Sequence, residues 1–186
     1  MNKQLYHQNI ESEVFRNRNK MSDRFFIRHF NSQSECVLYI RKMQYFYDKS
    51  KIKKVLAMLL KKKLVNKYGL CVEPTAIIGT GLHIPHPTGI VIGSSVVIGN
   101  NCSIYQNVTI GGARIGDSKN ANHPKIGDNV TIFAGSMILG NITVADNVVV
   151  AANSVLLTDA TVPGLYAGTP AKLVKSWEYK DDVEEK

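Results

Sequence analysis

The chain has 186 residues, of which 44% are hydrophobic, so its length suits one core domain with room for a small second unit. A formal net charge of +8 is compatible with a nucleic-acid partner, so we first ask where along the chain the charge lies. Residues 1–68 contain 16 Lys and Arg against 5 Asp and Glu, whereas residues 69–186 contain 7 against 10. All 14 glycines and all 6 prolines also lie after residue 68, so we expect a domain boundary there.

Three features bear on the cellular compartment. The first 15 residues lack the apolar run of a signal peptide, and the longest aliphatic run before residue 68, residues 55–60, is too short to cross a bilayer. Three cysteines, Cys36, Cys71 and Cys102, cannot all pair within one chain. These features predict a protein of the reducing cytoplasm.

Residues 1–68 are predicted to form a basic helical head. Asn31 or Ser32 is a suitable N-cap for a first helix, with Glu35 in its first turn. A second helix is expected after Ser50. Its apolar residues recur at spacings of three and four, and its other face is lysine-rich. The apolar residues are Ile52, Val55, Leu56, Leu59, Leu60 and Leu64.

The apolar side of this second helix allows two interpretations. We expect it to pack against the rest of the protein, with the lysines in water. Alternatively, a basic amphipathic helix lies on an anionic membrane surface, so peripheral membrane contact by the head stays open. Nucleic-acid binding is disfavoured because no aromatic residues alternate with the lysines and no readout motif is present.

From residue 126 an aliphatic residue occupies every sixth position. These positions are Ile126, Ile132, Ile138, Val144, Val150, Leu156 and Val162. Three places after each of the first six comes a residue type that tolerates a left-handed backbone: Asn129, Gly135, Asn141, Asn147, Asn153 and Asp159. A period of six fits neither a helix nor an alternating strand. It predicts short strands and corners stacked into a parallel β-helix, with the aliphatics in the core.

The same register begins at Ile78 and is interrupted twice. It shifts by two across residues 85–89, and it breaks again across residues 111–125. The first interruption contains His86 and the second contains His123. Loops that leave a rigid repeat are common functional positions, so we take these two histidines as candidate site residues. The β-helix is expected over residues 69–175, followed by a short tail, 176–186, that is either an exposed helix or disordered.

Four motifs carry a resemblance to a known family. Residues 86–93 (HPTGIVIG), 103–112 (SIYQNVTIGG), 123–126 (HPKI) and 168–172 (GTPAK) are similar, in the same order, to motifs of the serine acetyltransferases. Shorter-headed relatives that acetylate bacterial glycans share this core, and the head here has their length. The resemblance implies a left-handed parallel β-helix that forms a homotrimer. It also implies that acetyl-CoA, the acetyl donor, lies in a groove between neighbouring copies.

The resemblance also assigns roles to individual residues. It makes His86 the general base that takes the hydroxyl proton, and it places His123 and Asn122 at the acceptor. The CoA contacts that it implies are Gly111, Gly112, Ala134, Gly135, Lys172 and Lys175. A zinc site built from His83, His86 and His123 is disfavoured because the spacing does not resemble that of the β-helical carbonic anhydrases, so we expect no metal.

This sequence departs from the family at three charged positions. Cys71 and Pro85 stand where serine acetyltransferases have aspartates, and Asn122 stands where they have an arginine. Those charges would hold the ammonium and carboxylate groups of free serine, so their loss favours a neutral acceptor hydroxyl, such as one on a sugar or polysaccharide. Glu73, two residues from Cys71, is the candidate for orienting His86. The alternatives are a serine O-acetyltransferase and a non-catalytic β-helix scaffold.

Overall fold

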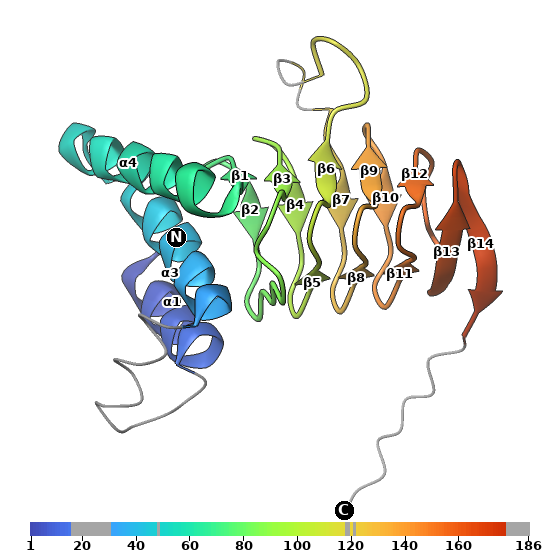
Figure 1. Ribbon diagram of the computed structural model, residues 1–186, viewed down its shortest axis with the longest axis horizontal. Helices are drawn as coiled ribbons and strands as arrows, with labels where there is room; N and C mark the ends of the chain where they lie inside the picture. Colours follow the sequence, from blue (N-terminus) through green and yellow to red (C-terminus); the bar gives the residue numbers. More distant parts are fainter. Residues whose placement is uncertain (16–30, 48, 118–119, 121, 178–186) are drawn as a thin grey trace, which may run out of the picture.

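The computed structural model describes residues 1–15, 31–47, 49–117, 120 and 122–177. A helical head stands at one end of a long coil of strands, and the strand pair β13 and β14 closes the other end (Figure 1). The head contains α1 (Lys3–Asn9), the π-helical segment η1 (Ile10–Val14), α3 (Ser32–Tyr47) and α4 (Lys51–Tyr68). Of the predicted tail, residues 178–186 lie outside the described residues.

Both predicted helices of the head are present, and the first has its predicted cap. The backbone N–H of Ser34 donates to Asn31 Oδ1 at 3.1 Å, so Asn31 is the side chain that caps α3. At α4, Ser50 Oγ accepts from the N–H of Lys53 at 3.3 Å. The helix ends at Gly69, which adopts a left-handed backbone with φ 63° and satisfies carbonyls of the last turn.

The prediction that the apolar side of α4 packs against the rest of the protein is wrong for most of the helix. Ile52, Val55, Leu56 and Leu59 are exposed, whereas Leu64 is buried. The side of α4 that faces α3 is instead built around Ala57 and Leu64. The apolar residues of α4 cover a wider part of the helix surface than α3 contacts. The periodicity of the sequence could not reveal which of these residues α3 would cover.

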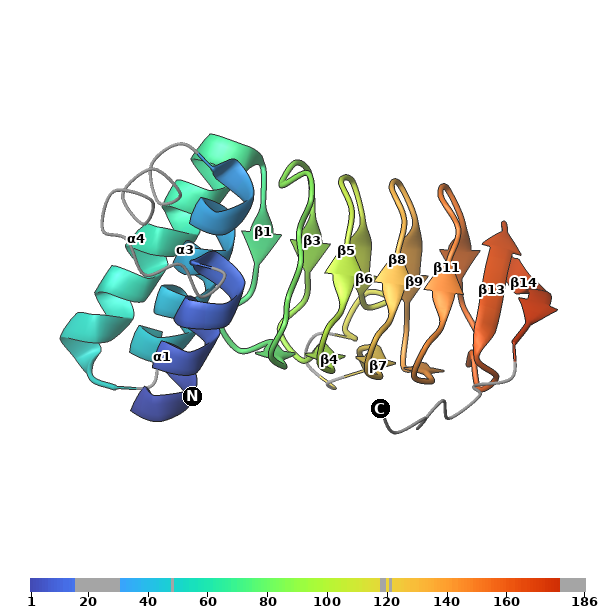
Figure 2. The ribbon, with the colours of Figure 1, turned by 90° about the horizontal axis from the view of Figure 1, so that it is seen from below.

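The coil is a parallel β-helix with three sheets, as predicted. Sheet A contains β1 (Cys71–Val72), β3 (Val91–Ile92), β6 (Thr109–Gly111), β9 (Met137–Leu139) and β12 (Val155–Leu156). Sheet B contains β2 (Ile77–Ile78), β4 (Val97–Ile98), β7 (Lys125–Ile126) and β10 (Thr143–Val144). Sheet C contains β5 (Ser103–Ile104), β8 (Thr131–Ile132), β11 (Val149–Val150), β13 (Gly164–Gly168) and β14 (Ala171–Ser176). The chain visits sheets A, B and C in turn, so each rung has three corners (Figure 2). We name each corner by the two sheets it connects: the AB, the BC and the CA corner.

The register shows where the two interruptions go. In a regular rung a residue pairs with the one 18 positions later, as Val91 does with Thr109. The separation grows to 20 between Cys71 and Val91, which places two extra residues at the CA corner that holds His86. It grows to 28 between Thr109 and Met137, which places ten extra residues at the AB corner that holds His123.

The predicted corner residues are right at two corners and wrong at the third. Asn129 and Asn147 at the BC corner, and Gly135 and Asn153 at the CA corner, have positive φ. The predicted Asn141 and Asp159 lie on the AB side and do not. The left-handed residue there is Gly140, and the Asp159 carboxylate instead accepts the N–H of Thr143 at 2.7 Å.

Six of the seven sixth-position aliphatics are buried, but Val162 is 42% exposed. The last AB corner is shorter than the others, so Val144 pairs with Ala160, a residue only 16 positions later in the chain. The register therefore advances by two, and Ala160 fills the core position predicted for Val162. Beyond this point β13 runs parallel to β11, and β14 folds back antiparallel against β13.

One buried arginine joins the head to the first rung. Arg41 of α3 is fully buried, and its Nε and Nη2 donate to the two carboxylate oxygens of Glu13 at 2.8 and 2.6 Å. The same guanidinium donates to the carbonyl oxygens of Ile78 and Gly79 at 2.9 and 2.5 Å. Glu13 Oε1 also accepts the N–H of Leu82 at 3.0 Å. The charge is therefore paired and its donors are used, as a buried guanidinium requires.

Candidate functional site

His86 lies on an exposed turn at the CA corner. The turn closes through a hydrogen bond from the N–H of Thr88 to the carbonyl of His86 at 2.8 Å. Gly89 ends it with φ 66°, and a Cβ there would come within 2.3 Å of Asn107 Oδ1, so this position requires glycine. The imidazole is exposed, as a base that meets a diffusible substrate must be.

The head fixes this turn from the outside. Gln33 of α3 donates its Nε2 to the carbonyl of Pro85 at 2.7 Å, one residue before His86. The N–H of Gly89 donates to the carbonyl of Tyr68, the last residue of α4, at 3.2 Å. The turn is therefore held at both ends by the head. No local pattern in the sequence points to Gln33, because the residue that it contacts lies 52 positions away in the chain.

Aromatic rings follow His86 along the coil. The ring of Tyr105 lies with its centroid 6.2 Å from that of His86, and the ring of Phe133 lies 4.9 Å beyond. Each belongs to the next rung at the same corner, so the three rings stack along the axis of the coil. They form an aromatic wall beside the imidazole that the sequence analysis had not singled out.

His123 has a different environment. It is only 3% exposed, and its ring lies so close to Gly93 that a Cβ at residue 93 would be 2.9 Å from Cδ2. Its Nδ1 is buried without a hydrogen-bond partner among the described residues. Leaving such a group unpaired costs about 1–3 kcal/mol, so sites that retain one are candidates for function.

The loop of His123 is organised by Asp117. One carboxylate oxygen accepts the N–H groups of Ala113 and Arg114 at 2.8 and 2.7 Å, and the other accepts Asn122 Nδ2 at 3.3 Å. The hydrogen bond from the N–H of Arg114, with the others, holds the pKa of Asp117 below its ordinary value. A pocket of about 390 Å³ lies beside this loop. Its lining includes Arg114, Asp117, Asn122, Leu139, Gly140 and Leu157.

The structure brings some predicted site residues together and separates others. His86, Ala134 and Gly135 lie at CA corners. His123, Asn122 and Gly112 lie at an AB corner, and Gly111 is the last residue of β6 before that corner. Within one chain the two histidines therefore occupy different edges of a three-sided coil. Lys172 and Lys175 are exposed on β14, at the end away from the head. His83 lies in sheet C, where it bridges to Ser103.

Glu73 has a partner other than His86. It follows β1 at an AB corner, and its Oε1 accepts from Lys61 Nζ at 2.5 Å. His86 lies at a CA corner, so within one chain the carboxylate is directed at the head and not at the imidazole. Cys71, Cys36 and Cys102 are free thiols. Burial raises the pKa of Cys102 to about 11 and that of Cys36 to about 12, so these two thiols stay protonated at neutral pH.

Comparison with known proteins agrees with the repeat and its motifs. The family described as bacterial transferase hexapeptide (six repeats) matches residues 123–158. The chain is similar to serine acetyltransferase 1, chloroplastic, of Arabidopsis thaliana, with 45% identity over 122 residues, 66% of this chain and 38% of that protein. It is similar to probable serine acetyltransferase 2 of Oryza sativa subsp. japonica, with 45% identity over 129 residues, 69% of this chain and 35% of that protein. The match thus spans little more than a third of the length of these curated relatives.

Solved structures extend the likeness to the head. The soybean serine acetyltransferase apoenzyme superposes with a TM-score of 0.78 and 32% identity, covering 92% of this chain and 70% of that one. A serine acetyltransferase from Neisseria gonorrhoeae gives 0.79 and 30%, covering 94% and 68%. A serine acetyltransferase in complex with CoA gives 0.75 and 30%, covering 92% and 71%. These likenesses assign the coil to the left-handed parallel β-helix class that the motifs implied.

Proposed function

Because the chain belongs to the serine acetyltransferase family of hexapeptide-repeat acyltransferases, we propose that it transfers the acetyl group of acetyl-CoA to a hydroxyl group, with serine as the acceptor. The observation that carries this proposal is the likeness to serine acetyltransferase structures over 92% of the chain, with His86 of the matched motif on an exposed, anchored turn.

The chemistry assigned to His86 follows from the properties of the two reactants. An alcohol is a weak nucleophile at neutral pH, so the attack on a thioester needs a base that removes the hydroxyl proton as the new bond forms. A neutral imidazole suits this task, because one of its ring nitrogens can accept a proton. The hydroxyl oxygen bonds to the thioester carbonyl carbon, the carbon–sulfur bond breaks, and the CoA thiolate takes up a proton. The imidazolium returns its proton in that step, so His86 ends the cycle neutral.

Serine replaces the sugar hydroxyl that the sequence analysis favoured. The relatives described above are named as serine acetyltransferases, which supports an amino-acid acceptor. One observation still favours a neutral hydroxyl as a second candidate. Asn122, at the position of the family arginine, carries no charge, and its amide donates to Asp117. An acceptor without a carboxylate would not need a cation at that position.

The placement of the two histidines supports a homotrimer. A single chain presents His86 and His123 on different edges of the coil, so a site that uses both needs the CA corner of one copy beside the AB corner of another. A contact of this kind joins two different surfaces of the same protein, and it closes into a ring under cyclic symmetry. Light scattering is expected to report three times the 20.6 kDa mass of one chain, and a monomer would contradict this assembly.

A thiol-release assay with acetyl-CoA tests the proposed reaction. Wild-type protein is expected to release CoA thiol in the presence of free serine, more slowly in the presence of sugars, and hardly at all without an acceptor. Turnover with sugars that exceeds turnover with serine would favour the second candidate. Absence of both turnover and CoA binding would leave a non-catalytic scaffold.

His86→Ala is expected to lower turnover by about 10²-fold or more, because the base is removed while the fold is retained. The exposed His83 provides a matched control, and His83→Ala is expected to keep its activity. Binding of CoA measured by calorimetry should be similar in both variants. Activity of His86→Ala near that of wild type would remove the residue from the mechanism.

A further inference from the structure

Helix α4 presents an apolar stripe to solvent that nothing in the proposed reaction uses. Ile52, Val55 and Leu59 are 78%, 59% and 56% exposed, and they lie on the same side of the helix because their spacing is three and four residues. Single exposed apolar residues are ordinary, but a contiguous stripe of them marks an interaction surface. We call Ile52, Val55, Leu56 and Leu59 the apolar stripe.

Lysines flank the apolar stripe on both sides. At 3.6 residues per turn, Lys51 and Lys62 fall along one edge of it and Lys67 falls along the other. Lys63 continues the line of the stripe one turn beyond Leu59. The helix carries seven lysines in all and no acidic residue. Only Lys61 and Lys67 pair with carboxylates of described residues, Glu73 and Glu35 respectively. We call Lys51, Lys62, Lys63 and Lys67 the lysine rim.

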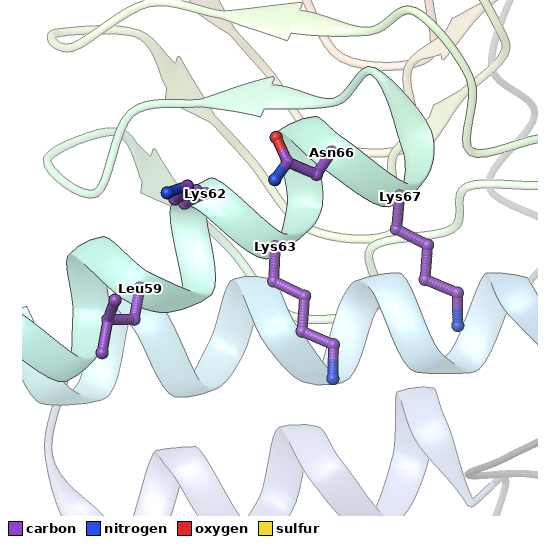
Figure 3. Close-up of a pocket in the computed structure, with 5 residues that line it drawn as sticks. All are labelled: Leu59, Lys62, Lys63, Asn66 and Lys67. Atoms are coloured by element: carbon purple, nitrogen blue, oxygen red, sulfur yellow. The ribbon is translucent and has the colours of Figure 1, made fainter.

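A shallow pocket joins the apolar stripe to the lysine rim. It measures about 370 Å³ and is lined by Leu59, Lys62, Lys63, Asn66 and Lys67 (Figure 3). Lys63 and Lys67 extend across it toward α3, where the Lys63 ammonium lies 4.6 Å from the centre of the Tyr39 ring. The pocket therefore combines an apolar side chain with several positive charges and an amide donor. An anionic headgroup attached to hydrocarbon has the matching chemistry.

We propose that α4 is a docking surface for an anionic phospholipid bilayer, with the helix lying in the plane of the interface. The apolar stripe enters the boundary between headgroups and acyl chains, and the lysine rim contacts lipid phosphates and carboxylates. None of the described helices combines the length and the apolar content that a bilayer crossing demands. The contact is therefore peripheral, and it goes beyond the proposed acetyl transfer.

Charge decides between a membrane and the other obvious occupant, a second copy of this helix. Two α4 surfaces brought face to face would place the eight lysines of two lysine rims near one another, with no acidic residue on either helix. Like charges at short distance oppose such a contact, whereas an anionic membrane neutralises them. The charge of the whole head has the same sign, with 16 Lys and Arg against 5 Asp and Glu in residues 1–68.

Co-sedimentation of the full chain with lipid vesicles tests the proposal. Wild-type protein is expected to sediment with vesicles of phosphatidylcholine containing phosphatidylserine, and not with phosphatidylcholine alone. Val55→Ser/Leu59→Ser keeps the charge and removes apolar contact, and it should weaken binding by at least about tenfold. Lys62→Gln keeps the apolar stripe and should weaken binding by about fivefold.

Two matched controls separate this surface from general attraction of a basic protein. Val162→Ser removes an exposed valine at the far end of the coil, and Lys125→Gln removes an exposed lysine of β7. Both are expected to bind vesicles like wild type. Because these side chains are exposed, circular dichroism of all four variants should match that of wild type.

Three results would overturn the proposal. The first is equal binding to neutral and anionic vesicles, or no binding to either. The second is wild-type vesicle binding by Val55→Ser/Leu59→Ser. The third is a smaller assembly of that variant in light scattering, combined with no vesicle binding by wild type, which would assign the apolar stripe to a second copy. Thiol release from acetyl-CoA is measured separately, so failure here leaves the proposed reaction unaffected.

Discussion

The coil and the head are stabilised in different ways. In the coil, successive rungs repeat one contact: aliphatic side chains such as Ile104, Ile132 and Val150 stack in register along a sheet. In the head, a few polar contacts made by single residues determine where α3 meets the first rung. Arg41 reaches Ile78 and Gly79, Gln44 donates to the carbonyl of Ala76, and Gln33 donates to that of Pro85.

This difference has consequences for stability. A repeat distributes its free energy over many similar contacts with neighbouring rungs, so one altered corner is a local loss. The buried ion pair of Arg41 and Glu13, which we call the clamp, concentrates its contribution to stability in two side chains. We therefore expect the head and the coil to respond differently to substitutions of similar size.

The largest expected effect is at the clamp. Arg41→Ala leaves the Glu13 carboxylate buried and unpaired, and loss of one partner of a buried pair costs about 3–5 kcal/mol. Chemical unfolding followed by circular dichroism should show the helical signal lost at lower denaturant than the signal of the coil. Glu13→Gln/Arg41→Met removes both charges and is expected to recover part of the loss. A single transition unchanged by Arg41→Ala would contradict the distinction between clamp and repeat.

The second effect depends on pH. Burial alone would raise the pKa of Glu35, but hydrogen bonds from Lys67, Tyr39 and Tyr68 outweigh it and lower the pKa from 4.5 to about 2. A depressed carboxyl pKa stabilises the fold above the unfolded value of 4.5, and this contribution is lost as the pH falls toward 2. The loss amounts to at most about 3 kcal/mol, since each pKa unit corresponds to about 1.4 kcal/mol.

Unfolding of the head at pH values between 5 and about 2 measures this contribution. Glu35→Gln should make the stability of the head less dependent on pH, because the titrating group is gone. Asp128 sits at a corner of the coil, where the hydrogen bond from the N–H of Asn100 lowers its pKa. Asp128→Asn is the matched control in the coil and should leave the pH response of the head unchanged. An equally steep pH response in Glu35→Gln would refute the assignment.

The smallest effect is at a single corner of the coil. Asn147 has φ 60°, a conformation that costs an ordinary L-residue about 1–2 kcal/mol. Asn147→Ala is expected to lower the free energy of unfolding by about that amount, and Asn147→Gly is expected to be close to neutral. Thermal unfolding of the two variants checks this. A loss for Asn147→Ala as large as that for Arg41→Ala would mean that corners are not independent units.

The residues of the candidate site also fall into two groups: those that the repeat reveals and those that depend on contacts between distant parts of the chain. His86 and His123 could be found from the sequence because each interrupts a strict period of six. Gln33, Tyr105 and Asp117 could not. Gln33 acts from the helical head, Tyr105 sits at a position whose residue type varies among the CA corners, and Asp117 caps a loop that lies outside the repeat. The role predicted for Glu73 also depends on which corner it occupies, and its contact with Lys61 follows from how α4 packs.

The sequence by itself determined the coil, because a period of six with turn-forming residues at a fixed offset is a local property that only stacked short strands satisfy. It also determined the two helices of the head and the cap of the first, which depend on neighbouring residues. Only the tertiary structure decided which side of α4 is covered, how Arg41 joins the head to the first rung, and that His86 and His123 lie on different edges. Those outcomes depend on contacts between residues far apart in the chain, and the free energy of such contacts is fixed by packing rather than by any pattern along the sequence.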